Sequence, residues 1–331
     1  MKEILNKLTL HKTLSKSEAK KILINISQGE YNNSQVASFL TVFMIRDITL
    51  NELEGFKEAL LELCISVDLS DYNTIDLCGT GGDNKDTFNI STLSAFVTAG
   101  AGIKVAKHGN YGVSSSCGSS NVMEDLGIKF SNDEDYLRKC IEKSGICILH
   151  APLFHPAMKH VAPIRKELGL KTFFNMLGPL VNPSFPKNQI VGVFSLELAR
   201  VYAYLFQKTE KNFSIIHSLD GYDEISLTGG VKIISNDSEK ILYPEDFKLN
   251  KLESKSIIGG RSIKESGEIF MSVLSNQSTE SQKKVVVANS GLAISTSTGV
   301  SIEEGISRAK ESLNSKNALK AFNTLKKLSE E

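Results

Sequence analysis

The stretch NTIDLCGTGGD, residues 73–83, carries the strongest fold signal in this sequence. Its apolar first half predicts a buried strand, its glycines predict a turn, and NIST at residues 89–92 opens a helix from about Ser91. This order of elements is typical of α/β folds. Glycines in the turn let backbone N–H groups approach an anion, and the helix N-terminus adds a partial positive charge. We therefore expect a phosphate-binding turn at residues 79–83, with a plain strand-to-helix turn as the alternative.

A second strand and loop follow the first. IKVAK at residues 103–107 predicts a strand, and KHGNYGVSSSCGSS at residues 107–120 supplies a lysine, a histidine, an amide and many hydroxyl and backbone donors. Neighbouring parallel strands bring their carboxyl ends to one edge of a sheet, where ligands bind in such folds. We expect both loops there, although a serine-rich loop can also be a solvated turn.

Two adjacent carboxylates mark a third segment, DGYDE at residues 220–224, directly after the predicted strand NFSIIHS. Asp223 and Glu224 repel each other unless a cation compensates their charge. Magnesium that bridges carboxylates and substrate phosphates is the expected cation. An acidic turn of the Asp-Gly kind is the structural alternative.

The fourth segment, APLFHPAMKHVAPIRKELGLKTFFNMLGPLVNP at residues 151–183, is basic, and its residues 156–177 have a helical pattern. Arg165 is a candidate fork for a carboxylate, because a guanidinium can donate two parallel hydrogen bonds. His155 and His160 are five residues apart, which does not place them on one helix face as metal ligands. We expect them to pack or to line a pocket.

Bulk properties limit the function further. With 331 residues the chain is long enough for two structural units. Lys plus Arg and Asp plus Glu both number 38, so no general attraction to nucleic acid or to a membrane is expected. The five cysteines show no paired C-x-x-C spacing, and neither a secretion signal nor an apolar run of about twenty residues is present. We expect a reduced, cytoplasmic protein.

The remaining elements complete an α/β architecture beside a helical unit. Capping boxes at Ser15 with Glu18 and at Thr49 with Glu52 begin helices within residues 1–66. Further strands are predicted at residues 146–150, 189–194, 212–218 and 283–289, helices at 133–144, 196–208 and from 302 onward, and peripheral strands and loops at 230–280. The expected units are a helical domain of residues 1–66 with 156–185 and an α/β domain, with a central mostly parallel sheet, of residues 67–155 with 186–331.

These four segments together resemble the anthranilate phosphoribosyltransferase family, which has a nucleoside phosphorylase-like fold. The resemblance runs through GTGGD with NIST, KHGN with VSS and GS, HPAMKHVAPIRKELGLKTFFNMLGPLVNP and DGYDE, in the family's order and over nearly the whole chain. It implies transfer of a phosphoribosyl group from 5-phosphoribosyl 1-pyrophosphate to anthranilate, the second step of tryptophan biosynthesis from chorismate. It also implies two Mg²⁺ ions and a homodimer joined through the N-terminal helices.

The resemblance assigns roles to individual positions. Asp223, Glu224 and Ser91 match the metal site, and Gly79, Asn110 and Arg165 match contacts to anthranilate. Electrostatic stabilisation of the reaction would come from Lys107 and the metal-site residues. The donor-binding positions are Gly79, Gly82, Asp83, Thr87, Asn89, Ile90, Ser91, Thr92, Lys107, His108, Gly109, Asn110, Tyr111, Gly112, Val113, Ser114, Ser115 and Ser119.

The second loop departs from the family pattern. Tyr111 and Gly112 stand where Arg followed by Ala or Ser is usual, Ser116 often corresponds to Lys, and Ser120-Asn121 replace a frequent Ala-Asp. The loss of two cations puts donor affinity in doubt more than reaction type. A pyrimidine nucleoside phosphorylase of the same fold and a non-enzymatic nucleic-acid-binding relative are the alternative functions, and the zero net charge weighs against the latter.

Overall fold

The computed structural model describes residues 1–112 and 117–331. The chain divides into a helical unit, Met1–Ser66 with Ala151–Pro183, and an α/β unit, Val67–His150 with Ser184–Glu331. The sequence-based boundaries at 155/156 and 185/186 therefore lie a few residues too late. The first differs because α8 (Ala151–Phe154) begins directly after a strand and is tied to the helical unit, where the Ile65 N–H donates to the Phe154 carbonyl at 2.8 Å.

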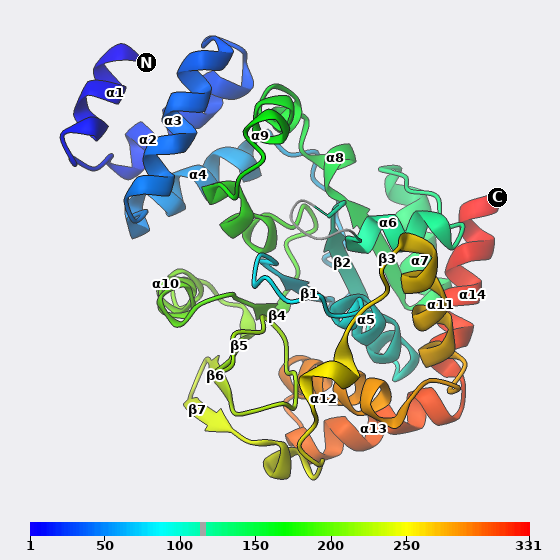
Figure 1. The fold of residues 1–331 in the computed structure, drawn as a ribbon. Helices are drawn as coiled ribbons and strands as arrows, with labels where there is room; N and C mark the ends of the chain where they lie inside the picture. The colour runs from blue at the N-terminus through cyan, green and yellow to red at the C-terminus, as the bar shows by residue number, and fades with distance from the viewer. Residues whose placement is uncertain (113–116) are drawn as a thin grey trace. The chain divides into compact units, whose positions relative to one another are not determined.

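The helical unit is built from short helices (Figure 1). In chain order they are α1 (Lys2–Thr9), α2 (Lys16–Ser27), α3 (Asn33–Ile45), α4 (Leu50–Leu63), α8, the 3-10 helix η1 (Pro156–His160), α9 (Ala162–Leu168), and the 3-10 helices η2 (Phe173–Met176) and η3 (Gly178–Leu180). Both predicted capping boxes are present, at Ser15 with Glu18 and at Thr49 with Glu52. Each box satisfies backbone N–H groups that a helix start leaves unpaired.

A cluster of aromatic rings forms the core of this unit. Phe39 and Phe43 on α3 and Phe56 on α4 are buried and contact Phe173 on η2. The Phe56 and Phe173 rings stack with centroids 4.4 Å apart, and the other pairs meet edge to face. Residues separated by more than 100 positions thus share one core, which is why residues 151–183 fold with the N-terminal helices.

The buried carboxylate of Glu52 joins three segments of the same unit. Glu52 is fully buried, and it accepts hydrogen bonds from the Leu14 N–H at 2.9 Å and the Thr49 N–H at 2.9 Å. Arg46 adds an ion pair at 2.5 Å. Because a buried charge is tolerated only when it is paired and hydrogen-bonded, this arrangement specifies how α3, α4 and the chain before α2 meet.

His155 lies between α8 and η1 and is only 4% exposed. Burial lowers the pKa of His155 to about 4, against the effect of backbone groups at Val181 and Leu60. The side chain is therefore neutral at pH 7, and its burial agrees with the expectation that it packs inside the protein.

This shift predicts a pH-dependent stability. The unfolded chain takes up a proton at His155 near its ordinary pKa of 6.5, whereas the folded chain does so only near 4. Stability from this group is thus complete above pH 6.5 and declines as the pH falls toward 4, by about 3 kcal/mol. Urea unfolding between pH 7 and 4 should show wild type losing this amount relative to His155→Gln. Parallel curves for the two proteins would contradict the assignment.

The α/β unit contains a seven-stranded sheet within the part of the chain that the structure describes. Its strands are β1 (Ile75–Gly79), β2 (Val105–Gly109), β3 (Ile146–His150), β4 (Asn188–Gly192), β5 (Asn212–Ser218), β6 (Val231–Ser235) and β7 (Glu239–Leu242). Its helices are α5 (Ile90–Gly100), α6 (Ser119–Asp125), α7 (Glu134–Ser144), α10 (Leu196–Phe206), α11 (Ile263–Leu274), α12 (Glu280–Thr298), α13 (Ile302–Asn314) and α14 (Asn317–Glu330), with the 3-10 helices η4 (Pro244–Phe247) and η5 (Ser254–Ile257).

The strand order β3-β2-β1-β4-β5-β6-β7 places a switch point between β1 and β4. The first five strands in this order are parallel, β6 is antiparallel to β5, and β7 is antiparallel to β6, which confirms the mostly parallel sheet. The chain leaves β1 toward β2 but leaves β4 in the opposite direction, toward β5. Right-handed crossovers then put α5 and α10 on opposite faces, as Figure 1 shows. Ligands bind beside such a switch point, at the carboxyl ends of the strands.

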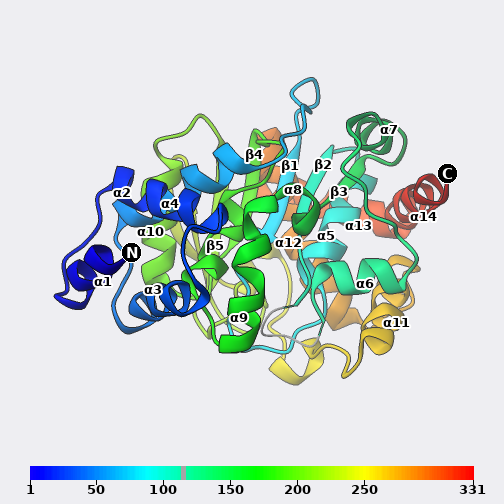
Figure 2. The same ribbon diagram turned by 90° about the horizontal axis from the view of Figure 1, so that it is seen from above.

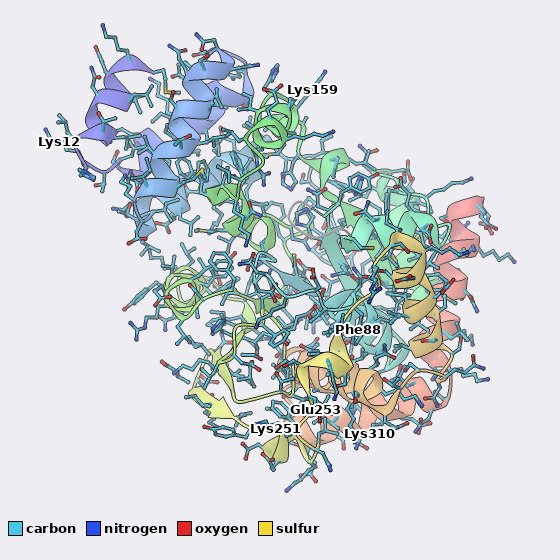
Figure 3. All side chains as sticks on the ribbon, viewed as in Figure 1. Lys12, Phe88, Lys159, Lys251, Glu253 and Lys310 are labelled. Atoms are coloured by element: carbon cyan, nitrogen blue, oxygen red, sulfur yellow. The ribbon has the colours of Figure 1, made fainter. Side chains whose placement is uncertain are left out.

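A layer of helices covers one face of the sheet. α5 packs on β1 and β2, and α12 packs on β4 and β5; α13 and α14 pack in turn on these two helices. The view from above shows α7 and α14 beside each other next to β3 (Figure 2). Buried apolar residues such as Phe88 lie inside the unit, while Lys251 and Lys310 project from its outside (Figure 3).

Two sequence-based expectations for this unit are wrong. Residues 283–289, predicted as a strand, belong to the helix α12, in which Val285, Val286, Val287 and Ala288 are all buried. A helix that is apolar on every side has no amphipathic period, so it resembles a buried strand. Region 230–280 contains the helix α11 as well as the expected strands and loops.

α12 also bears on membrane insertion. No single helix of the described residues is long and apolar enough to cross a membrane; α12 and α13 pass that test only as a pair bent by 120°.

Candidate active site

The glycine turn after β1 lies against the loop between β5 and β6. A Cβ on Gly79 would come within 2.6 Å of Asp223 Oδ2, and one on Gly192, at the end of β4, would lie 1.5 Å from the Asp223 backbone oxygen. The Gly81 N–H donates to Asp223 Oδ2 at 2.8 Å, and the Thr80 N–H donates to the Gly192 carbonyl at 2.9 Å. Absent side chains at both strand ends therefore let the acidic loop reach the switch point.

Asp223 is a buried carboxylate that lies beside the carboxylate of Asp83. Its backbone N–H donates to Asp83 Oδ2 at 3.4 Å. Burial and the Asp83 charge raise the pKa of Asp223 to about 7, despite the hydrogen bond from Gly81. The carboxyl group is thus costly to ionise as long as no cation compensates it.

Glu224 reaches the N-terminus of α5. Its Oε1 accepts the Ser91 N–H at 2.9 Å, and its Oε2 accepts the Thr87 hydroxyl at 3.4 Å. Burial and the charges of Asp223 and Asp83 raise the pKa of Glu224 well above its ordinary value. The helix N-terminus and the Lys107 charge act in the opposite direction.

Lys107 on β2 is 2% exposed, and its Nζ donates to the Leu77 carbonyl at 2.6 Å. Leu77 lies on the neighbouring strand β1, so the ammonium group is held under the glycine turn rather than projecting into solvent. The ammonium charge acts to lower the pKa of Glu224. Its charge therefore offsets part of the repulsion among Asp83, Asp223 and Glu224, which together form the acidic cluster.

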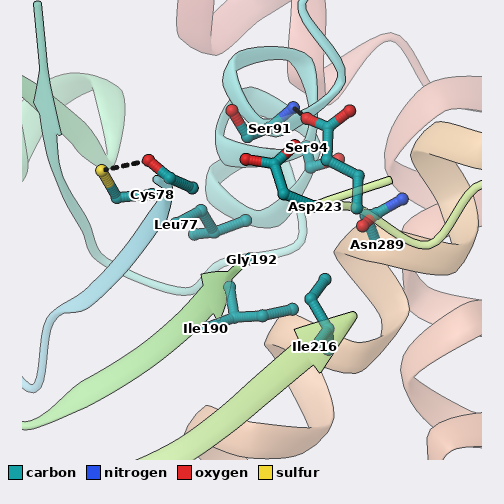
Figure 4. A pocket seen from close by; sticks show the side chains of 11 residues that line it. Leu77, Cys78, Ser91, Ser94, Ile190, Gly192, Ile216, Asp223 and Asn289 are labelled. Carbon is teal, nitrogen blue, oxygen red and sulfur yellow. Dashed lines mark hydrogen bonds between the residues drawn. The ribbon is translucent and has the colours of Figure 1, made fainter. Parts of the chain in front are cut away.

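A small cavity of about 20 Å³ lies behind the carboxylates (Figure 4). Asp223, Glu224 and Ser91 line it together with Asn289 from α12 and apolar side chains of the sheet, including Ile190 and Ile216. The space is about enough for one water molecule. Figure 4 shows the Ser91 and Asn289 side chains approaching it from different helices.

The second loop begins where β2 ends. The Asn110 carbonyl accepts the Ser120 N–H at 3.1 Å and the Ser119 hydroxyl at 3.2 Å. Asn121 Oδ1 accepts both the Gly112 N–H and the Gly118 N–H at 3.0 Å. The end of β2 and the start of α6 are thereby closed into one loop.

Three departures from the family pattern form a local network in this loop. The Tyr111 hydroxyl donates to Glu124 Oε1 at 3.0 Å, and its ring meets the edge of His150 at 4.8 Å. Ser120 Oγ lies 2.8 Å from His150 Nδ1. Together with Asn121, these side chains anchor the loop to β3 and α6. Tyr111 thus has a structural role where the family pattern has an arginine.

In the helical unit, Arg165 stands on α9 with its guanidinium over the Phe174 ring, 5.2 Å from the ring centroid. Its Nη2 donates to Asn175 Oδ1 at 3.2 Å, and its buried Nε has no hydrogen-bond partner among the described residues. Burial lowers the pKa of Arg165 to about 10, so the group remains charged at neutral pH. A partly buried guanidinium with unused donors is suited to an incoming carboxylate.

Comparison with known proteins matches both units. The glycosyl transferase family a/b domain matches residues 71–319, and the helical bundle domain of the same family matches residues 2–64. An anthranilate phosphoribosyltransferase of Flavobacterium psychrophilum is 67% identical over 99% of this chain and 100% of its own length. The chain belongs to the anthranilate phosphoribosyltransferase family. Notably, the identity extends through both units.

Solved structures of the anthranilate phosphoribosyltransferase family have the same fold. The enzyme from Thermus thermophilus superposes with a TM-score of 0.91 at 30% identity and covers 99% of each chain. The enzyme from Saccharomyces cerevisiae in complex with PRPP (5-phosphoribosyl 1-pyrophosphate) and Mg has a TM-score of 0.90 at 29% identity. The match covers 98% of this chain and 96% of the yeast chain.

Among the described residues that the family resemblance assigns to the donor, the metal or anthranilate, all but Arg165 lie in the α/β unit. Gly79 ends β1, Asn89 precedes α5, and Asp223 and Glu224 lie between β5 and β6. Arg165 alone belongs to the helical unit. Val113, Ser114 and Ser115 lie outside the described residues. The others are in the turn after β1 (Gly82, Asp83, Thr87), the first turn of α5 (Ile90, Ser91, Thr92), β2 (Lys107, His108, Gly109), the loop after it (Asn110, Tyr111, Gly112) and α6 (Ser119).

The sequence-based reasoning missed residues that support this site without carrying charge. The residue pattern places Gly192 in a strand and assigns it no functional role. Ser218 ends a predicted strand, and Asn289 lies in a predicted strand that the structure shows to be the helix α12. The signal for Gly192 was a glycine at the carboxyl end of a parallel strand, in the same position as Gly79 on its neighbour. No local pattern identifies Ser218 or Asn289, because their partners are distant in sequence or lie in a loop.

The acidic cluster fits a divalent cation bound partly by a substrate. No three His, Cys, Asp or Glu side chains of the described residues converge into a ready-made metal cage. Mg²⁺ commonly uses one or two carboxylates and completes its shell with water and phosphate oxygens. The raised pKa values of Asp223 and Glu224 show that the pair is energetically unfavourable until such a charge arrives.

Gly192 lies so close to the Asp223 backbone that it leaves no space for a side chain, whereas Gly229 has space for one and serves as a control. In Gly192→Ala, the new methyl group would overlap the Asp223 carbonyl, so the loop must shift. We expect a destabilisation of about 1–3 kcal/mol or more, measured as a lower unfolding temperature. Gly229→Ala in the same loop should be tolerated, because its nearest neighbour, Asp220 Cγ, is 3.6 Å away. Equal unfolding temperatures for the two variants would contradict this packing argument.

Proposed function

We propose that this chain transfers the phosphoribosyl group of 5-phosphoribosyl 1-pyrophosphate to the amine of anthranilate, which releases pyrophosphate and forms N-(5-phosphoribosyl)anthranilate. One observation carries the proposal beyond family membership. A glycine turn, a helix N-terminus and two adjacent carboxylates, of which Asp223 is buried, meet at the switch point of the sheet. That combination suits a ligand with several phosphates and a divalent cation. Within tryptophan biosynthesis, this is the second step from chorismate.

The donor would lie over the ends of β1 and β2. Backbone N–H groups of the glycine turn, the first turn of α5 and the loop after β2 are suited to its phosphate oxygens. The buried hydroxyl of Thr92, which has no hydrogen-bond partner among the described residues, supports this placement. The proposed donor contacts are those inferred from the family resemblance, including Val113, Ser114 and Ser115 outside the described residues.

Mg²⁺ would be held by Asp223, Glu224 and Ser91, and we propose two ions. The yeast relative was solved with PRPP and Mg, which supports the use of this metal. The bound metal neutralises charge on the pyrophosphate as the leaving group departs. The ionised forms of Asp223 and Glu224, unfavourable in the metal-free protein, become the stable forms beside such a cation.

Anthranilate would be bound by its carboxylate. Arg165 offers a charged guanidinium with an unpaired Nε, and Asn175 and Phe174 hold its orientation. Asn110 and Gly79 are the other proposed anthranilate contacts. We assign them from the family resemblance.

The chain's residues would promote the reaction by binding, orientation and charge rather than by proton transfer. The bond from ribose C1 to pyrophosphate loosens and leaves an oxocarbenium-like centre, as in glycoside cleavage, which the arylamine attacks from the opposite face. An arylamine is already unprotonated near neutral pH, so attack needs no strong general base, and the proton that the nitrogen loses once its bond to C1 has formed passes to solvent. Backbone N–H groups aimed at the departing oxygens contribute several kcal/mol in comparable sites, and Lys107 balances the acidic cluster.

We also propose a cytoplasmic homodimer joined through the N-terminal helices, with no nucleic-acid or membrane partner. Leu10 and Ile45 in this region are 69% and 77% exposed, which supports an apolar contact between copies. Light scattering of the purified protein should give twice the chain mass of 36.3 kDa, and a monomer mass would refute the dimer.

The experiment that tests the activity is depletion of anthranilate fluorescence in the presence of PRPP, with and without Mg²⁺. We expect signal loss only with Mg²⁺, because the carboxylate pair needs a cation to bind the donor's pyrophosphate. Glu224→Gln should lose most of this activity and retain the fold. Signal loss that is independent of Mg²⁺, or none with folded protein, would refute the proposal.

The acceptor site is tested by Arg165→Ala. We expect the KM for anthranilate to rise by about 10–100-fold, as for the loss of a charge-assisted hydrogen-bonded pair of about 1.5–3 kcal/mol. The KM for PRPP should change little. Lys166→Ala, an exposed neighbour on α9, is the control and should leave both values unchanged. Equal increases in both KM values for Arg165→Ala would exclude a specific role in binding the carboxylate.

A further inference from the structure

Glu224 is followed by a peptide bond that is held on both sides by buried side chains. The Glu224 carbonyl accepts the Ser218 hydroxyl at 2.6 Å, and the Ile225 N–H on the same peptide donates to Asn289 Oδ1 at 3.0 Å. Asn289 Nδ2 donates to the next carbonyl, that of Ile225, at 2.9 Å. We propose that Asn289 and Ser218 are positioning residues that orient Glu224 for the metal.

Asn289 uses its carbonyl oxygen and both of its amide hydrogens in hydrogen bonds to the backbone. Besides its two bonds to Ile225, its second amide hydrogen goes to the Val285 carbonyl one turn earlier in α12, at 2.9 Å. The side chain is 4% exposed and sits on a helix buried on all sides. The bond to Val285 fixes the orientation of the Asn289 amide. The hydrogen bonds from this amide therefore hold the loop peptide in a fixed position relative to α12.

Glu224 is therefore held at both ends by packed helices. Its backbone is tied to α12 through Asn289, and its carboxylate is tied to the N-terminus of α5 through the Ser91 N–H. The two helices pack on each other, and Ser290, next to Asn289, donates to the Ser94 carbonyl at 3.4 Å. Any displacement of one tether would strain the other.

The hydrogen bonds to Glu224 hold its carboxylate in a position that is electrostatically unfavourable for a negative charge. Asp223, Asp83 and burial all disfavour a charged Glu224, so an unrestrained loop would relax by moving the carboxylate toward solvent. A fixed backbone keeps the carboxylate in place before the cation arrives, which lowers the cost of ordering the site on binding. Groups that orient a metal ligand typically change metal affinity by about 10–100-fold when removed.

The inference rests on the proposed function, in which Glu224 contacts Mg²⁺. The cavity of about 20 Å³ beside Asn289 determines the choice of variant. Asn289→Ala would enlarge this space and admit a water molecule that could replace the lost hydrogen bonds. Asn289→Leu fills the volume and leaves Ile225 without a partner, so it is the sharper test.

A matched control lies at the other end of the sheet. Asn188 begins β4 at the amino edge, is fully buried, and donates to Asn73 Oδ1 at 2.9 Å and to the Thr74 carbonyl at 3.1 Å. Asn188→Leu removes a comparable buried amide, and hence comparable stability, away from the carboxylates. A purely structural effect of losing a buried asparagine would appear in both variants.

The experiment measures the Mg²⁺ concentration that gives half-maximal anthranilate consumption, and calorimetric binding of PRPP at several Mg²⁺ concentrations. For Asn289→Leu we expect the half-maximal Mg²⁺ concentration to rise by about tenfold or more, with weaker PRPP binding that high Mg²⁺ restores. The KM for anthranilate should stay within about twofold. Asn188→Leu should leave the Mg²⁺ dependence unchanged.

A milder variant keeps the test valid if Asn289→Leu does not fold. Ser218→Ala removes one hydrogen bond to the Glu224 carbonyl and should raise the half-maximal Mg²⁺ concentration by about threefold, a lesser form of the same effect. Unchanged Mg²⁺ dependence in the folded variants, while Glu224→Gln abolishes it, would overturn this inference alone. If Glu224→Gln also left the Mg²⁺ dependence of wild type intact, the proposed metal site itself would fail.

Discussion

The site depends on the burial of Asp223 and Glu224 against the switch point of the sheet. Burial raises the pKa of both groups, the charge of Asp83 adds to this for both, and the charge of Asp223 adds to it for Glu224, so the unpaired charges would push the acidic loop outward. Opposing contacts hold the loop inward: the Gly81 N–H on Asp223, the Ser91 N–H on Glu224 and the nearby charge of Lys107. The structure thus stores an unfavourable charge arrangement that a cation would relieve, which suits a site for a metal-bound pyrophosphate.

The sheet order explains why these contacts come from distant parts of the chain. β1 and β4 are neighbours although an entire helical insertion separates them in sequence, and only glycines at their ends, Gly79 and Gly192, leave room for the Asp223 loop. The helical unit obeys a separate constraint, the aromatic core that Phe173 shares with the N-terminal helices. Each unit therefore closes around its own core although its segments alternate along the chain.

The residue pattern predicted those elements whose local signals agree. β1, β2 and β5 are strands followed by turn residues, and the capping boxes of α2 and α4 lie at the predicted positions. α12 was missed because its burial on every side removes the helical period, although the capping box at Thr279 with Gln282 was present in the sequence. The charged and glycine positions of the site were recognisable by chemistry and family resemblance. Ser218 and Asn289 were not, because their importance comes only from the hydrogen bonds that they make in the folded structure.

The departures from the family pattern in the second loop remove positive charge, but the substituted side chains make contacts that hold the loop to its neighbours. An arginine at position 111 would add a cation beside the donor's phosphates, whereas Tyr111 instead contacts Glu124 and His150. Ser120 and Asn121 extend the same network to His150 and to the backbone of Gly112 and Gly118. Anchoring of the loop has thereby replaced charge at this position. In the proposed donor site, compensation of the donor's phosphates would then depend more on backbone donors and on a cation held by Asp223 and Glu224.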